Sequence, residues 1–178
     1  MERPFVVCHM LTSLDGKIDG PFFDAPETVP AVKAYRELRI FYGCQATLYG
    51  TTTMLCGYAE GKTGQLPTAT AAPPQVDWVN PVGRAMGNFI VAVDPQGQLA
   101  YSGASIEKKG RPAAHVIEAL TEQASPEYLS YLQKQGISYL FAGREQLDCS
   151  LLLEKLRRLF ATDKLMLAGG GILNGAFL

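Results

Sequence analysis

Residues 164–178 run Lys-Leu-Met-Leu-Ala-Gly-Gly-Gly-Ile-Leu-Asn-Gly-Ala-Phe-Leu, with three consecutive glycines between two apolar runs. This order predicts a strand over Lys164–Ala168, a tight turn at Gly169–Gly171 and a helix that begins near Ile172. Glycines at such a junction let the backbone approach a ligand, because no Cβ atom stands in the way. The unpaired N–H groups at the start of a helix favour phosphate. The same arrangement also serves packing alone, so this junction leaves both interpretations open.

Strand-like and helix-like segments alternate along the rest of the chain. Short apolar runs predict strands over Phe5–Leu11, Gln45–Tyr49, Phe89–Val93, Ala113–Leu120 and Ile137–Ala142. Turn residues and apolar spacing predict helices over Thr28–Tyr42, from Ser125 to Gly136, and from Asp148 or Ser150 to Phe160. This alternation predicts an α/β fold in which helices cover a sheet.

Two segments carry further expectations. One side of the helix expected over Thr28–Tyr42 is apolar, with Ala31, Ala34, Tyr35, Leu38, Phe41 and Tyr42. The segment Gly57–Arg84 is rich in Gly, Pro, Thr and Ala and has little periodicity. A loop of this length is either functional or a surface excursion.

Composition excludes several classes of function. The chain has 178 residues, a hydrophobic content of 47%, a charged content of 19% and a net charge of -1. This length fits one domain over residues 1–178. Without a basic block, we expect neither nucleic acid nor a membrane surface as a partner. No apolar run approaches the ~20 residues that span a bilayer, and the start of the chain does not resemble a signal peptide, so we expect a cytoplasmic location.

Cysteine and histidine spacing gives no sign of a metal or disulfide framework. The four cysteines are widely scattered without a C-x-x-C pair and are interpreted as buried or incidental thiols: Cys8, Cys44, Cys56 and Cys149. His9 and His115 lie inside apolar runs without a second ligand at metal spacing, so we expect no metal site.

A second motif follows the first predicted strand directly. The segment Thr12-Ser-Leu-Asp-Gly-Lys-Ile18 resembles the S-L-D-G-K-I signature of the reductase domain of riboflavin biosynthesis, which belongs to the dihydrofolate reductase-like superfamily. Ala46–Thr53 resembles the family's strand that ends in G-x-x-T, and Phe89–Leu99 its strand with an Asp-containing turn. Leu167–Leu178 resembles its G-G-G-x-L-N junction. The resemblance covers nearly the whole chain, and the first and last motifs are the most specific.

The resemblance implies a dihydrofolate reductase-like fold, with a mixed, mostly parallel central sheet between helical layers (α/β/α). It also implies an NADPH-dependent reductase that acts on 5-amino-6-(5-phosphoribosylamino)uracil or a related phosphorylated heterocycle. Hydride would pass to the ribosylamino C1′ of the substrate. Because the coenzyme itself supplies the hydride, the role of the protein would be to hold the hydride donor close to the acceptor carbon in the correct orientation.

Coenzyme contacts follow from the same resemblance. Gly169, Gly170 and Gly171 would border the pyrophosphate, whereas Gly50 and Thr53 would hold the adenosine-phosphate half. Asp94 is a further candidate contact. Hydroxyl groups and bare backbone N–H groups suit phosphate oxygens. As structural alternatives, Thr53 would cap the short helix after Gly50, and Asp94 would serve only its turn.

The substrate side would come from the loop that follows the first strand. By resemblance, Ser13, Asp15 and Lys17 would lie beside the nicotinamide and the substrate. Lys17 would meet a substrate phosphate as a point charge, and Asp15 would bind a ribose hydroxyl or orient a proton donor. Asp15-Gly16 is also a common turn pair, and a lone lysine is by default a solvated charge.

The sequence departs from the family mainly on the substrate side. Met54–Tyr58 stands where the family has an acidic D-x-P segment and a basic residue that grip the ribose phosphate. Ala168 replaces a common Glu before the glycines, and Gln45 replaces an Asp. These departures keep open a dihydrofolate- or pterin-type reductase on the same scaffold.

The end of the chain is the other departure. The sequence stops at Phe177-Leu178 inside a predicted helix, where family members continue into further strands. We expect a C-terminally truncated domain whose exposed apolar surface and sheet edge a homodimer would cover. A non-catalytic nucleotide-binding module is therefore a third alternative.

Overall fold

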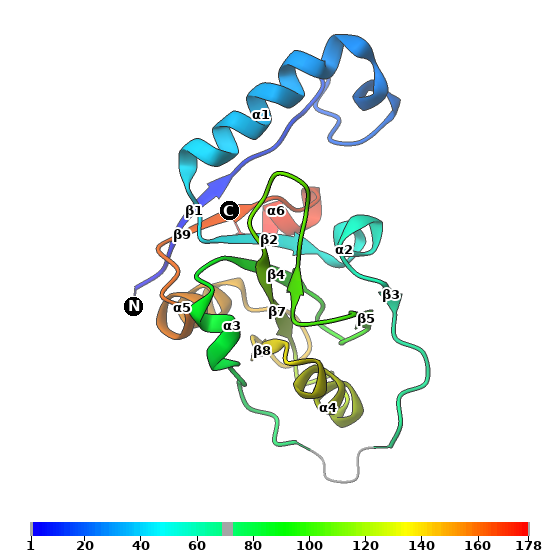
Figure 1. Cartoon of the computed structure of the whole chain (residues 1–178), viewed down its shortest axis with the longest axis vertical. Coiled ribbons are helices and arrows are strands. Elements are labelled where there is room, and N and C mark those ends of the chain that lie inside the picture. Colours follow the sequence, from blue (N-terminus) through cyan, green and yellow to red (C-terminus); the bar gives the residue numbers. More distant parts are fainter. Residues whose placement is uncertain (1, 69–72, 178) are drawn as a thin grey trace.

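The computed structural model describes residues 2–68 and 73–177 and has an α/β architecture (Figure 1). Its seven-stranded sheet has the order β1-β9-β2-β4-β7-β6, and β8 also pairs with β7. The strands are β1 (Phe5–Cys8), β2 (Ala46–Gly50), β4 (Phe89–Val93), β6 (Ser105–Ile106), β7 (Ala114–Leu120), β8 (Ser138–Phe141) and β9 (Lys164–Leu167). Neighbouring strands are parallel, apart from the antiparallel pair β6–β7. The predicted mixed, mostly parallel sheet is therefore confirmed.

Helices lie on both faces of this sheet. They are α1 (Val29–Tyr42), α2 (Thr51–Gly57), α3 (Pro81–Ala85), α4 (Pro126–Gln135), α5 (Cys149–Phe160) and α6 (Gly171–Phe177). Leu129 and Leu132 of α4 pack with Ile90 on one face. Leu152 and Leu156 of α5 pack on the other face, against strand residues that include Val91 and Ile117. Two separate apolar cores thus flank the sheet, which gives the three-layer arrangement.

The ends of α4 and α5 follow the predicted signals. Ser125 caps α4 by accepting a hydrogen bond from the N–H of Tyr128 at 3.1 Å, and Gly136 ends that helix with a φ of 75°. Asp148, rather than Ser150, caps α5, because its carboxylate accepts the N–H of Leu151 at 2.9 Å. Side-chain acceptors satisfy helix N–H groups that have no partner within the helix.

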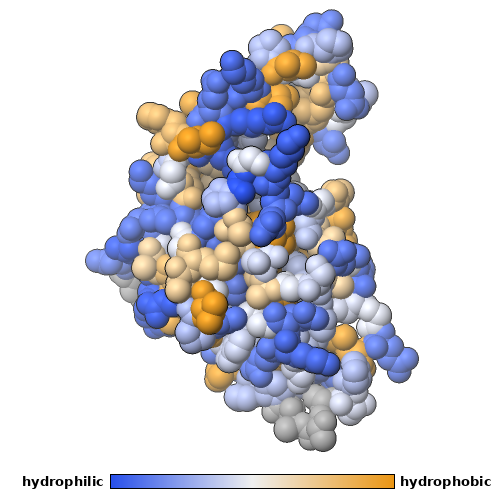
Figure 2. Space-filling view, in the orientation of Figure 1, coloured by the Kyte–Doolittle hydropathy of each residue, from blue (hydrophilic) through white to orange (hydrophobic). Residues whose placement is uncertain are grey.

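Helix α1 forms where predicted, yet none of its residues is buried. Leu38 and Phe41 on its apolar side are 46% and 80% exposed. Tyr35 does turn inward and stacks on His9, with ring centroids 4.1 Å apart. The helix projects beside the chain that follows β1 (Figure 1), and apolar patches lie among charged groups over it (Figure 2).

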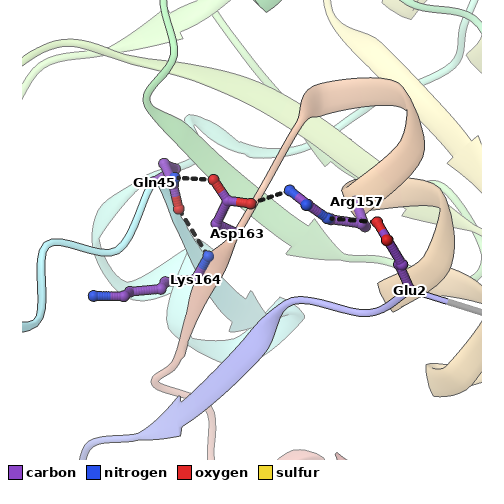
Figure 3. Close-up of polar contacts among 5 residues, drawn as sticks. All are labelled: Glu2, Gln45, Arg157, Asp163 and Lys164. Atoms are coloured by element: carbon purple, nitrogen blue, oxygen red, sulfur yellow. Dashed lines mark hydrogen bonds and ion pairs between the residues drawn. The ribbon is translucent and has the colours of Figure 1, made fainter.

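The start of β9 is held by a polar network (Figure 3). The side chain of Gln45 accepts the N–H of Lys164 at 2.8 Å and donates to the carboxylate of Asp163 at 3.3 Å. Arg157 pairs with the same carboxylate and reaches Glu2 at 3.6 Å. Gln45 therefore joins the start of β2 to the start of β9. Because the two strands are parallel, their carboxyl ends lie at the same edge of the sheet.

The segment Gly57–Arg84 is more than a surface excursion, although residues 69–72 lie outside the described part. It contains β3 (Gly61–Lys62), which pairs with β5 (Leu99–Ala100), and all of α3 but its last residue, Ala85. Trp78 exchanges backbone hydrogen bonds with Tyr139 of β8 at 3.0 and 2.9 Å. Among the described residues, no helix is long and apolar enough to cross a bilayer.

Helix α3 closes over a buried histidine. His115 is fully buried, with its Nε2 atom 2.8 Å from the hydroxyl of Ser138. A Cβ atom on Gly83 would lie 2.2 Å from the His115 ring. Burial lowers the pKa of His115 to about 4. The neutral imidazole is therefore the form that the folded protein accepts.

Stability should fall on acidification because of this histidine. Unfolded histidine titrates near pH ~6.5, so its contribution is present above that pH and is lost as the pH falls toward about 4. We expect wild type to lose about 2 kcal/mol more than His115→Gln between these values, measured by urea unfolding. Glu118, whose pKa burial raises, has the opposite pH dependence, but it is present in both proteins and cancels in the difference. Equal losses in the two proteins would contradict this expectation.

Candidate functional site

A cleft of about 830 Å³ opens at the carboxyl ends of the central strands. Gly50 ends β2, Val93 ends β4 and Ala168 follows β9, and all three line it. In open sheets of parallel strands, ligands bind at this edge. Segments that are remote in sequence meet there: the loop after β1, the start of α2, and the β9–α6 junction.

The three glycines at the β9–α6 junction differ in their surroundings. A Cβ atom on Gly169 would lie 2.6 Å from Cδ2 of Leu173, so the absence of a side chain there serves packing. A Cβ atom on Gly170 or Gly171 would meet nothing within 4 Å. All three line the cleft. The packing interpretation thus applies to Gly169, whereas contact of Gly170 and Gly171 with a ligand stays a prediction.

Asn174 fixes the shape of this junction, and sequence reasoning did not single it out. Its side-chain oxygen accepts the N–H of Gly169 at 3.1 Å, and its own N–H donates to the carbonyl of Gly170 at 2.9 Å. Asn174 is buried. The asparagine in the G-G-G-x-L-N pattern was the available signal for this positioning role.

The three threonines that open α2 also line the cleft. The hydroxyl of Thr51 donates to the carbonyl of Val93 at 2.8 Å, which ties α2 to the end of β4. No side-chain cap bond is formed at the start of α2, so the structure does not give Thr53 the capping role that was its alternative. Thr53 lines the cleft, and its role as a coenzyme contact stays a prediction.

Asp94 lies outside the lining of the cleft and is fully buried. Its carboxylate accepts the N–H groups of Gln98 and Leu99 at 2.6 and 2.9 Å. Glu118 is buried nearby and takes a hydrogen bond from the hydroxyl of Tyr101. Burial and then the Asp94 charge raise the pKa of Glu118. These contacts give Asp94 the turn role that was its alternative, with its carboxylate outside the lining of the cleft.

This placement predicts that Asp94→Ala destabilises the protein without weakening coenzyme binding. A buried N–H group of Leu99 and a partly buried N–H group of Gln98 would lose their acceptor, which should cost about 2 kcal/mol in the free energy of unfolding. Urea unfolding measures that loss, and NADPH titration below the unfolding range should give a Kd within about twofold of wild type. A large change in Kd with unchanged stability would restore the coenzyme role.

The predicted substrate residues lie on an exposed turn. Ser13 donates to the carboxylate of Asp15, and Lys17 pairs with that carboxylate at 2.9 Å. These hydrogen bonds hold the pKa of Asp15 below its ordinary value. None of the three residues lines the cleft, although Ile18 and Asp19 of the same loop do. Their roles beside nicotinamide and substrate therefore stay predictions.

Charge in the cleft is sparse. Asp19 is the one charged residue of the described lining, which includes no lysine or arginine. A phosphorylated ligand would therefore depend on backbone N–H groups and hydroxyls. Two cysteines, Cys56 and Cys149, also line the cleft. Of the two interpretations of the thiols, buried or incidental, the first does not hold for Cys8 and Cys56, which are exposed. No cluster of metal-ligating side chains occurs within residues 2–68 and 73–177.

Comparison of the structure with solved structures identifies the fold. Riboflavin Biosynthesis Reductase Rib7 of Saccharomyces cerevisiae superposes with a TM-score of 0.57 at 18% identity, over 96% of this chain and 64% of that one. The chain has a riboflavin-reductase fold. RibD of Acinetobacter baumannii, which shares it, has a TM-score of 0.55 at 16% identity, over 98% of this chain and 42% of that one. No family model and no curated protein matches the sequence.

The riboflavin-reductase fold confirms the resemblance seen in the sequence at the level of architecture. The chain spans less than two thirds of the length of either neighbour. Identity below one fifth leaves the cleft residues as the basis for any statement about activity.

Proposed function

We propose that this chain is an NADPH-dependent reductase that binds its coenzyme in the cleft at the carboxyl ends of β2, β4 and β9. The observation that carries the proposal is the meeting of Thr51–Thr53 and Gly169–Gly171 in one cleft of about 830 Å³. This volume lies within the range of small-molecule sites, roughly 300–1,000 Å³. The riboflavin-reductase fold adds support, because proteins named as reductases share it.

The residues present fit a dinucleotide. Open space at Gly170 and Gly171 leaves their backbone free for the pyrophosphate. The hydroxyl of Thr53, which lines the cleft, would bind the adenosine-phosphate half. Bound NADPH would supply the hydride, and the protein would hold it against the acceptor and exclude water. The described residues of the cleft lining include no cation for the 2′-phosphate, so NADH should be titrated in parallel with NADPH.

For the substrate we propose a phosphorylated heterocycle that accepts hydride at a ribosylamino C1′, as in the riboflavin-pathway reduction. Lys17 would contribute positive charge to the substrate phosphate from the turn beside the cleft. Asp15, held ionised by Ser13 and Lys17, would accept a hydrogen bond from a ribose hydroxyl. The loop reaches the cleft through Ile18 and Asp19.

Thiol protection tests coenzyme binding at this place. Cys56 lines the cleft and is exposed, whereas Cys8 is exposed but lies outside the lining. Saturating NADPH should slow alkylation of Cys56 about tenfold or more, because opening must precede reaction in the bound state. Cys8 should react at an unchanged rate. Unprotected Cys56 in a folded sample, together with no saturable fluorescence change on NADPH titration, would refute the proposal.

A pterin-type reductase is the second candidate. Tyr58 stands in the segment where riboflavin-pathway reductases have acidic and basic residues, and its hydroxyl contacts Tyr49 and Arg111 instead. NADPH oxidation measured with a phosphoribosylamino-pyrimidine and with dihydrofolate separates the two candidates.

A further inference from the structure

A second cavity, of about 270 Å³, lies away from the coenzyme cleft. It is enclosed by the end of α1, the first residues of β4, and the segment Ile106–Pro112 that precedes β7. Its apolar wall includes Phe89, Ile90, Ile106 and Met166. No residue lines both cavities. The second cavity therefore opens near the starts of the strands, whereas the cleft opens at their ends.

The charge of this cavity is one-sided. Arg39, Lys108 and Arg111 line it, and no aspartate or glutamate does. Within residues 2–68 and 73–177, none of the three forms an ion pair with a carboxylate. Three cations thus surround one small space without a counter-charge.

Neutral groups hold these cations in place. Arg39 donates to the hydroxyl of Thr47 and to the sulfur of Met166, the latter at 3.1 Å. Arg111 donates to the hydroxyls of Tyr49 and Tyr58 at 3.2 and 3.3 Å. Such bonds orient a guanidinium and leave its charge uncompensated.

Lys108 and Tyr58 complete the wall. The ammonium group of Lys108 lies 5.1 Å from the ring centroid of Tyr58, a cation–π distance. Burial and the neighbouring Tyr49 raise the pKa of Tyr58 to about 12, so its hydroxyl stays neutral at physiological pH. The tyrosine therefore adds no negative charge.

From this arrangement we propose that the cavity is a second ligand site, for a small phosphomonoester carried on an apolar or aromatic body. Phosphate oxygens would take charge-assisted hydrogen bonds from both guanidinium groups, and the organic body would lie against Ile90 and Ile106. The volume is near the lower end of small-molecule sites, roughly 300 Å³, so the ligand is small. Because this cavity shares no lining residue with the coenzyme cleft, we expect its ligand to bind whether or not NADPH is bound.

Calorimetric titration with phenyl phosphate tests this site, in the presence and absence of saturating NADPH. We expect saturable binding that NADPH does not compete away. Arg111→Gln and Arg39→Gln should each weaken it about tenfold or more, because each removes a charge-assisted hydrogen bond. Lys109→Gln, which removes the same charge from an exposed residue outside the lining, should change it less than about twofold.

Titrations with two further compounds identify which ligand group the cavity recognises. Benzyl alcohol should fail to bind, because it lacks the anion, and benzoate should bind more weakly than phenyl phosphate. Equal losses in Lys109→Gln and Arg111→Gln, competition by NADPH, or no saturation in wild type would each overturn the proposal. If Arg111→Gln does not fold, Arg39→Gln and Lys108→Gln decide the matter by the same criteria. Failure here with intact protection of Cys56 by NADPH would leave the proposed function standing.

Discussion

Gly170→Asp is expected to weaken NADPH binding by about 100-fold or more while the protein stays folded. Gly170 is exposed in the cleft, and a Cβ atom there meets nothing within 4 Å. The aspartate side chain therefore has room, but its charge would face the pyrophosphate. Repulsion between like charges at close range, roughly 4 Å, costs a few kcal/mol near a protein surface.

Matched variants isolate this charge. Gly170→Asn has nearly the same shape without the charge and should lose far less affinity. Gly175→Asp places the same charge on an exposed residue of α6 outside the lining and should leave the Kd near that of wild type. Fluorescence titration gives the three Kd values, and circular dichroism checks the fold. Similar affinities for Gly170→Asp and Gly175→Asp would place the coenzyme elsewhere.

Gly97→Ala should cost about 3 kcal/mol in the free energy of unfolding, from two sources that act together. Gly97 has a φ of 70°, a conformation that an alanine adopts only with strain. A Cβ atom there would also lie 2.4 Å from the ring of Tyr128, which is fully buried. Neither the turn nor the ring can move away easily, because Asp94 fixes the turn and α4 holds the ring.

Gly87→Ala separates the two sources. Gly87 has a φ of 65°, yet a Cβ atom there meets nothing within 4 Å. This variant should lose only the strain contribution, roughly 1–2 kcal/mol. Urea unfolding of both variants gives the contribution of the clash as the difference. Equal losses would show that the Tyr128 ring yields without cost.

The sequence predicted most of the strands because each is a short apolar run that ends at a turn signal. Phe89–Val93 was predicted at its observed bounds, and β2, β7, β8 and β9 begin or end within one residue of prediction. Buried parallel strands give this signal strongly, since both faces are covered. The residue types at Ser125 and Asp148 likewise predict the starts of α4 and α5, and Gly136 predicts the end of α4.

The rest depends on contacts that no local pattern contains. Asp94 has the residue type of a ligand contact and of a turn, and its burial and its bonds to the N–H groups of Gln98 and Leu99 distinguish the two roles. The apolar spacing of α1 predicts a face but not what covers it. Arg39 and Arg111 are 72 positions apart by their numbering, so the fold alone brings them to one cavity. Local sequence signals do not predict which distant residues the fold brings together.

Leu173 fills the space left by the missing side chain of Gly169, because a Cβ atom there would lie 2.6 Å from its Cδ2 atom, whereas a Cβ atom on Gly50 would meet that atom at an ordinary contact distance of 3.4 Å. Positions 169 and 173 therefore form one steric unit. An alanine at 169 would be tolerated only with a shorter residue at 173, so the pair should co-vary among homologous chains. Such covariation in an alignment would identify chains that keep this packing in the cleft lining, even where Gly169 itself has been replaced.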